Sequence, residues 1–64
     1  MNEYQDRVID EQQELSSKIG RLQQFIETET YRDLHTQDRT LLSRQLNAMN
    51  EYDSILQQRI KLFE

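Results

Sequence analysis

Apolar residues recur every three or four positions along the first part of the chain, from about residue 2 to residue 27. Val8, Leu15 and Leu22 are spaced by seven residues, and polar residues fill most of the positions between them. This spacing places the apolar side chains on one face of an α-helix, whereas a half-buried strand would alternate. Asn2 is a suitable N-cap. The pattern therefore predicts a first helix over about residues 2–27.

A second helical pattern covers about residues 37–63, and it carries two apolar lines instead of one. The first line repeats every seven residues and consists of Leu42, Met49, Leu56 and Phe63. The second line, offset by about 100° around the helix, consists of Leu41, Gln45, Ala48, Tyr52, Ile55, Arg59 and Leu62. We expect Thr36 to cap the start of this helix.

The connector between the two helices, residues 28–36, reads TETYRDLHT. Threonine and aspartate side chains compete with a helix for backbone hydrogen bonds and favour caps and turns. We expect Thr30 to cap a short turn over residues 31–34. In that turn, Tyr31 and Leu34 are predicted to close the open end of a helical hairpin.

Folding the chain at the connector brings the apolar faces of the two helices together. The register that matches most apolar positions places Ile19 near Met49 and Val8 near Ile60. Two long helices packed in this way are antiparallel and cross at a shallow angle, as in coiled coils. We therefore expect residues 1–64 to form one all-α domain, an antiparallel two-helix hairpin.

The second line has no partner within such a hairpin, and contiguous exposed apolar surface usually marks an interface. A 64-residue chain without cysteine has neither a large core nor disulfides to stabilise it. We therefore expect self-association to provide the missing stability. We expect a homodimer that forms a four-helix bundle, or a larger homo-oligomer. The predicted interface consists of Leu41, Gln45, Ala48, Tyr52, Ile55 and Leu62.

Three polar residues, Gln45, Tyr52 and Arg59, repeat every seven positions inside the second line. They can set the register of an oligomer seam, which is the best-attested role of polar residues there. Alternatively, they can line a groove in which the arginine holds a carboxylate or phosphate. Gly20 also has two interpretations, because it is either merely tolerated in the first helix or permits close approach of another helix.

Twelve acidic and eight basic residues give the chain a net charge of −4. This balance disfavours binding along a nucleic-acid backbone, because cation–phosphate contacts supply most of that affinity. A small anionic ligand requires only a local group of cations. The antiparallel register brings Arg7 near Arg59 and Lys61 at the open end of the hairpin. These three residues are therefore the candidate ligand-binding site.

Motifs for catalysis and metal binding are absent from the sequence. It contains no glycine-rich phosphate loop, nucleophile elbow or zinc-protease helix motif, and the single His35 has no obvious nucleophile beside it. The acidic residues Asp6, Asp10, Glu11 and Glu14 lack a histidine ligand and are interpreted as a solvated helix face. We therefore expect no enzyme activity, no cofactor and no metal site.

Membrane association is not expected either. No apolar run approaches the roughly 20 residues that span a bilayer, and the acidic N-terminal segment lacks the layout of a secretory signal. The absence of cysteine fits a reducing compartment. We therefore expect a cytoplasmic protein.

Two stretches, YQDRVIDEQQELSSKIGRL (residues 4–22) and LLSRQLNAMNEYDSILQQRI (residues 41–60), resemble the crAss-like phage hypothetical-protein family. The matching positions are Tyr4, Gln5, Arg7, Val8, Asp10, Glu11, Gln45, Met49, Tyr52, Ile55, Leu56, Arg59 and Ile60. The resemblance implies a phage or prophage origin and brings no catalytic residue with it. The architecture is also similar to helical-hairpin sponges that sequester cyclic-nucleotide immune signals, which is an analogy of fold alone.

The phage likeness, together with a small acidic hairpin that lacks catalytic motifs and has surplus apolar surface, favours a phage-encoded accessory protein. We expect it to act by stoichiometric binding and to inhibit a bacterial anti-phage defence system. Its expected target, in the cytoplasm of the bacterial host, is either a defence protein or a nucleotide immune signal. The alternative is a self-assembling structural or regulatory protein-interaction module of a phage or prophage.

Overall fold

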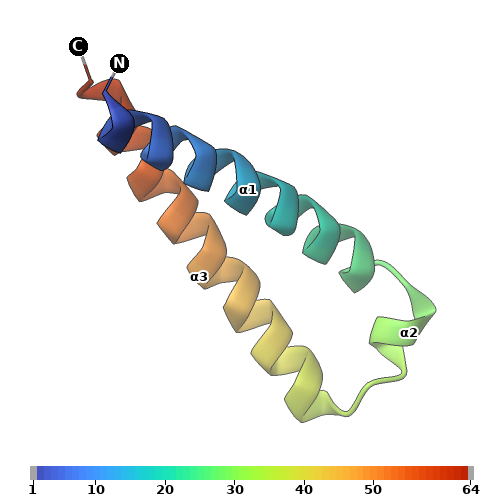
Figure 1. Cartoon of the computed structure of the whole chain (residues 1–64). Helices are drawn as coiled ribbons and strands as arrows, with labels where there is room; N and C mark the ends of the chain where they lie inside the picture. The colour runs from blue at the N-terminus through green and yellow to red at the C-terminus, as the bar shows by residue number, and fades with distance from the viewer. Residues whose placement is uncertain (1, 64) are drawn as a thin grey trace.

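The structure is a computed structural model that describes residues 2–63. Three helices follow one another within this range: α1 (Glu3–Ile26), α2 (Glu29–Arg32) and α3 (Thr36–Lys61). Figure 1 shows α1 and α3 running antiparallel, with both chain ends at one end of the molecule and α2 at the other. The all-α class is confirmed, whereas the expected two-helix hairpin contains a third, short helix in its connector.

The first helix begins at the cap that the sequence predicts. The side chain of Asn2 accepts a hydrogen bond of 2.9 Å from the backbone N–H of Gln5, which satisfies one of the unpaired N–H groups at the start of α1. Glu3 and Asp6 place negative charge in the same turn. The helix dipole favours acidic residues at this position.

The short helix α2 is capped by Thr28 rather than by Thr30. The Thr28 Oγ1 accepts a hydrogen bond of 3.3 Å from the N–H of Tyr31 and donates one of 2.6 Å to the carbonyl of Phe25. Because Thr28 lies between the two helices, its side chain joins the end of α1 to the start of α2. The predicted turn over residues 31–34 is thus displaced toward the N-terminus, and Thr30 lies inside a helix.

The third helix also begins differently from the prediction. Its N-cap is His35, whose side chain makes no capping hydrogen bond. Thr36 is already helical, and its Oγ1 instead accepts a hydrogen bond of 3.2 Å from the Arg39 guanidinium. The first N–H groups of α3 therefore receive no cap from the His35 side chain and can meet other acceptors.

The core lies between α1 and α3 and is small. Four apolar side chains are buried in the described range: Val8, Leu15, Ile19 and Leu56. Four half-buried side chains pack against them: Leu46, Met49, Ile60 and Phe63. The apolar face of the first helix and the first line of α3 thus face each other, as the sequence predicts.

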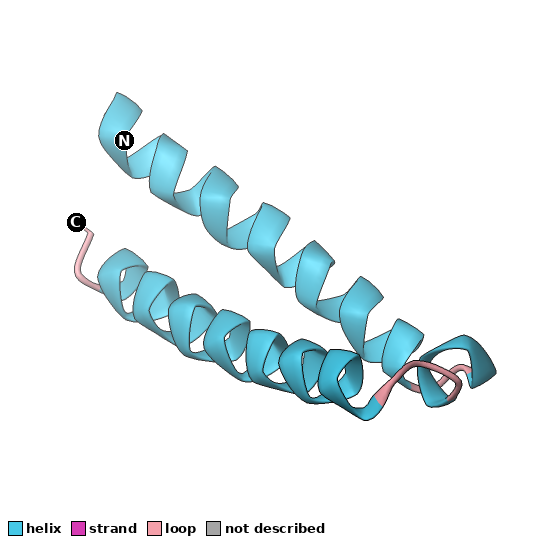
Figure 2. Ribbon diagram, turned by 90° about the horizontal axis from the view of Figure 1, so that it is seen from below, coloured by secondary structure: helices cyan, strands magenta, loops and turns pink. Residues whose placement is uncertain are grey.

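The molecule is a rod of 46 × 14 × 13 Å. Its radius of gyration is 14.7 Å, whereas a compact chain of this length would have one of about 11 Å. Figures 1 and 2 show the two long helices inclined to each other rather than strictly parallel. Such a rod exposes most of its side chains, so one chain encloses little apolar surface. Between residues 2 and 63, no helix is both long and apolar enough to cross a membrane.

Candidate functional site

The predicted oligomer interface is exposed along α3. The exposed fractions are 57% for Leu41, 42% for Tyr52, 45% for Ile55 and 81% for Leu62, and Gln45 and Ala48 are exposed as well. Helix α1 therefore covers the first line, whereas these six residues of the second line are exposed in the described chain. We call Leu41, Ala48, Tyr52, Ile55 and Leu62 the apolar face of α3. Its role as an interface stays a prediction.

The three predicted ligand cations lie at the end of the molecule where the chain begins and ends. Arg7 forms an ion pair with Glu3 on the surface of α1. The Arg59 guanidinium lies 5.8 Å from the centre of the Tyr4 ring and donates a hydrogen bond to the Tyr4 hydroxyl. Lys61 is exposed in the last turn of α3. Arg7 and Arg59 thus have separate partners, and their role in ligand binding stays a prediction.

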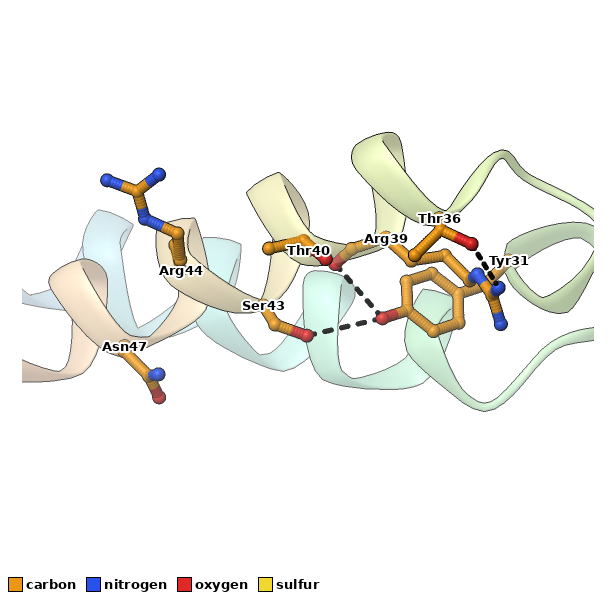
Figure 3. Close-up of a pocket in the computed structure, with 7 residues that line it drawn as sticks. All are labelled: Tyr31, Thr36, Arg39, Thr40, Ser43, Arg44 and Asn47. Carbon is orange, nitrogen blue, oxygen red and sulfur yellow. Dashed lines mark hydrogen bonds between the residues drawn. The ribbon is translucent and has the colours of Figure 1, made fainter.

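A different group of polar residues meets at the opposite end, where α2 lies against α3. They surround an open hollow of about 400 Å³ (Figure 3), which we call the arginine hollow. Its lining residues are Tyr31 from α2 and Thr36, Arg39, Thr40, Ser43, Arg44 and Asn47 from α3. Sequence reasoning missed this site, because polar residues at helical spacing are also the pattern of an ordinary solvated face.

Tyr31 connects the three helices at this end. Its ring packs edge-on against Phe25 of α1, with 6.1 Å between the ring centres. Its hydroxyl donates to the backbone carbonyl of Arg39 and lies within hydrogen-bond distance of the Ser43 Oγ, at 3.2 Å in each case. Figure 3 shows both bonds reaching from the ring to α3. This side chain therefore holds α2 against α3 and forms one wall of the arginine hollow.

Two arginines give the hollow positive charge. Arg39 is half-buried and donates a hydrogen bond from its guanidinium to the Thr36 Oγ1. Its Nε is buried and has no hydrogen-bond partner among the described residues, so the guanidinium retains unused donor capacity. Arg44 is exposed and projects from the other end of the hollow (Figure 3). In that view the Arg39 guanidinium lies beside the Tyr31 ring, whereas the Arg44 guanidinium points away from it. Both arginines line the hollow.

The arginine hollow offers several hydrogen-bond donors beside apolar surface. Guanidinium groups bind phosphate or carboxylate oxygens through charge-assisted pairs of bonds, and the hydroxyl of Thr40 and the amide of Asn47 can add neutral ones. The N-terminal turn of α3 begins at the rim, where the helix dipole attracts anions. No acidic residue lines the described hollow, although the net charge of the chain is −4. The arrangement suits a small anionic ligand.

A second hollow of about 320 Å³ adjoins the first. It is lined by Thr36, Gln37, Thr40 and Leu41, and its surface is largely apolar. The two hollows share Thr36 and Thr40, and Leu41 also belongs to the apolar face of α3. The pair of hollows therefore suits a ligand that carries both an anionic group and an apolar or aromatic ring.

The likeness to a known family extends over nearly the whole chain. The model of the Sequestin family matches residues 2–62. This range contains all three helices and the residues of both hollows. No curated protein and no solved structure matches the chain significantly.

Proposed function

Because the chain belongs to the Sequestin family of small phage anti-defence proteins, we propose that it sequesters a signal molecule of a bacterial defence system. The proposed ligand is a small nucleotide, which carries phosphate and an aromatic base. By holding the nucleotide in the cytoplasm of the host, the protein keeps it from its receptor. This action is stoichiometric and requires no catalysis.

The observation that carries the proposal is the arginine hollow beside the apolar one. Arg39 and Arg44 supply the positive charge and paired donors that a phosphate group requires. The apolar hollow offers a wall beside Leu41 against which a base can lie. A volume of about 400 Å³ also falls within the range of small-molecule sites, roughly 300–1,000 Å³.

Isothermal titration calorimetry with a panel of cyclic mono-, di- and trinucleotides tests the proposal. We expect at least one of them to bind. The double variant Arg39→Gln/Arg44→Gln should weaken that binding by about tenfold or more, since a hydrogen bond to a charged group contributes about 1.5–3 kcal/mol. Arg21→Gln is the matched control, because it makes the same type of change at an exposed position on α1.

The fate of the nucleotide separates sequestration from catalysis. When the complex is denatured, mass spectrometry should recover the bound nucleotide unchanged. A chemically altered product would instead indicate an enzyme. If no nucleotide of the panel binds the native protein, the nucleotide proposal is wrong and a protein target remains.

The exposed apolar face of α3 favours a second candidate function, in which the protein binds a protein surface. The partner is then a host defence protein, or the chain is a self-assembling structural or regulatory module of the phage. Co-purification from infected cells distinguishes the two. A defence component supports inhibition, whereas a virion or replication protein supports the module. Assignment to crAss-like phages stays a prediction from the sequence resemblance.

A further inference from the structure

The hydroxyl of Tyr31 has a single proton, and its surroundings fix where that proton goes. Its two hydrogen-bond neighbours are the backbone carbonyl of Arg39 and the hydroxyl of Ser43, each at 3.2 Å. A carbonyl oxygen can only accept, so Tyr31 donates its proton to Arg39. The Tyr31 oxygen then accepts from Ser43, and the Ser43 proton points toward Tyr31.

Tyr31 also occupies the acceptor that Ser43 would otherwise use. The carbonyl of Arg39 lies four residues before Ser43 in α3, and a helical serine can donate its proton to the carbonyl at this position. That carbonyl has two lone pairs. One receives the backbone N–H of Ser43 through the regular helical bond, and the other receives the Tyr31 hydroxyl. The Ser43 proton is therefore directed away from the backbone of α3.

The position of the Tyr31 hydroxyl does not depend on Ser43. The Tyr31 ring packs edge-on against Phe25 of α1, with 6.1 Å between the ring centres. Its backbone N–H donates to the Thr28 Oγ1. Figure 3 shows the hydroxyl reaching α3 beside Ser43. Contacts with α1 and with the cap of α2 thus hold the hydroxyl in place, and the Ser43 proton is oriented before any ligand arrives.

We propose that Tyr31 is a specificity-determining residue of the arginine hollow, because it fixes Ser43 as a hydrogen-bond acceptor. With its proton committed, Ser43 presents only lone pairs to the hollow that it lines. Ser43 lies between Arg39 and Arg44 along α3, so an anionic group bound by either arginine brings its neighbouring atoms close to Ser43. The ligand that this arrangement selects carries a hydroxyl group beside its anionic group, as the ribose of a ribonucleotide does.

The selected ligand in this inference rests on the proposed function, whereas the orientation of Ser43 does not. Arginine side chains only donate, so they bind oxygens of many kinds and do not distinguish a hydroxyl from an ether or ester oxygen. Ser43 does distinguish them, because only a group with a proton forms a hydrogen bond to it. One such bond contributes about 0.5–1.5 kcal/mol, or about two- to tenfold in affinity.

An NMR titration with two matched nucleotides tests the selectivity. Adenosine 3′-monophosphate has a 2′-hydroxyl beside its phosphate, and its 2′-deoxy-2′-fluoro analogue has an atom of similar size there without a proton. We expect the native protein to bind the hydroxyl form about two- to tenfold more tightly. Ser43→Ala should abolish this ratio of affinities. Tyr31→Phe should reduce it, because the freed Ser43 hydroxyl can then donate to either nucleotide.

The ratio separates the orientation of Ser43 from a purely structural role of Tyr31. If Tyr31 only holds α2 in place, Tyr31→Phe weakens the binding of both nucleotides equally and leaves the ratio unchanged, which would overturn the proposal. Tyr4→Phe removes a hydroxyl at the other end of the molecule and should retain the native ratio. Ser43→Thr keeps a hydroxyl at the same position and should retain the preference for the hydroxyl form.

The carbonyl carbon of Arg39 reports the orientation of Ser43 without any ligand, because its NMR chemical shift responds to the hydrogen bonds that the carbonyl accepts. Ser43→Ala should hardly move this resonance in the native chain, in which the Ser43 proton goes to Tyr31. In Tyr31→Phe the Ser43 proton is free to go to the Arg39 carbonyl, so adding Ser43→Ala should shift the resonance clearly. Equal shifts in both backgrounds would show that Tyr31 does not orient Ser43.

The two measurements also distinguish failure of this inference from failure of the proposed function. If calorimetry finds a bound nucleotide but the native protein binds the two matched nucleotides equally, the selectivity is wrong and the proposed function stands. If no nucleotide binds, the selectivity fails together with the proposed function, and the Arg39 resonance still decides the orientation of Ser43.

Discussion

The side-chain amide of Gln12 on α1 donates a hydrogen bond of 3.1 Å to the carboxylate of Asp53 on α3. Asp53 is half-buried, and its other oxygen accepts a bond of 2.6 Å from Gln57, one turn further along. A carboxylate is tolerated in the seam because both of its oxygens are hydrogen-bonded. This bond favours one register of the two helices. Apolar contacts alone specify a register poorly, because they are non-directional.

Replacing Asp53 by alanine deprives the half-buried Gln12 amide of its acceptor. We expect the free energy of unfolding to fall by about 1–2 kcal/mol, measured by urea denaturation and circular dichroism. Asp10→Ala removes an exposed carboxylate from α1 and should change the free energy by less than about 0.5 kcal/mol. Equal effects of the two substitutions would show that the cross-helix bond does not stabilise the hairpin.

Truncating Leu56 to alanine removes a side chain with no exposed surface from the centre of the core. The loss of packing should lower the free energy of unfolding by about 2–5 kcal/mol. That is a large part of the roughly 5–15 kcal/mol typical of a domain, so thermal melting by circular dichroism should shift strongly downward. Gln58→Ala, at an exposed position two residues away, is the control. A shift no larger than that of the control would contradict the assigned core.

Gly20 lies inside α1, and a methyl group added there meets no atom within 4 Å apart from the neighbouring residues and backbone of its own helix. Gly20→Ala should therefore stabilise the chain by about 0.5–1 kcal/mol, because alanine loses less conformational freedom in a helix. Thermal melting measures this gain. The close-approach interpretation makes the opposite prediction, since a second helix packed at Gly20 would be displaced. Weaker self-association of the variant by light scattering would support that interpretation.

Removing the Tyr31 hydroxyl by substitution with phenylalanine deletes both hydrogen bonds to α3 but retains the ring packed against Phe25. We expect a loss of about 0.5–1.5 kcal/mol of stability for each hydrogen bond. Hydrogen exchange should become faster in residues 28–34, because α2 is then held less firmly. Tyr4→Phe makes the same change at the other end of the molecule and should leave this exchange unaltered. Unchanged exchange in Tyr31→Phe would mean that other contacts hold α2.

Much of the helical core could be predicted from the sequence. The seven-residue spacing of Val8, Leu15 and Leu22 places them on one face of the helix; Val8 and Leu15 are buried, and Leu22 is half-buried. Leu56 belongs to the predicted first line and is fully enclosed. The exposure of Tyr52 and Ile55 follows from the same reasoning, since a second line offset by about 100° points away from one neighbouring helix. The spacing of the apolar residues is sufficient for these predictions, because the fixed rotation per residue of an α-helix determines which side chains share a face.

The residues that cap the helices around the connector were harder to predict from the sequence than the core. Thr28, Thr30 and Thr36 all have the side chain of a cap, and the residue type alone does not distinguish them. The outcome depends on where α1 ends and on the direction in which the chain leaves α2. Thr36 illustrates this point, because its hydroxyl accepts from Arg39 instead of capping α3.

Short-range information in the sequence by itself determined the all-helical class, the buried stripe and the surplus apolar line of α3. These depend on residues within a few turns of one another. Only the tertiary structure decided which distant side chains meet: Gln12 with Asp53, and Tyr31 with Ser43. The arginine hollow exists because the path of the connector sets Tyr31 beside a polar face of α3. No spacing within one helix encodes that path, because it results from the packing of three helices at once.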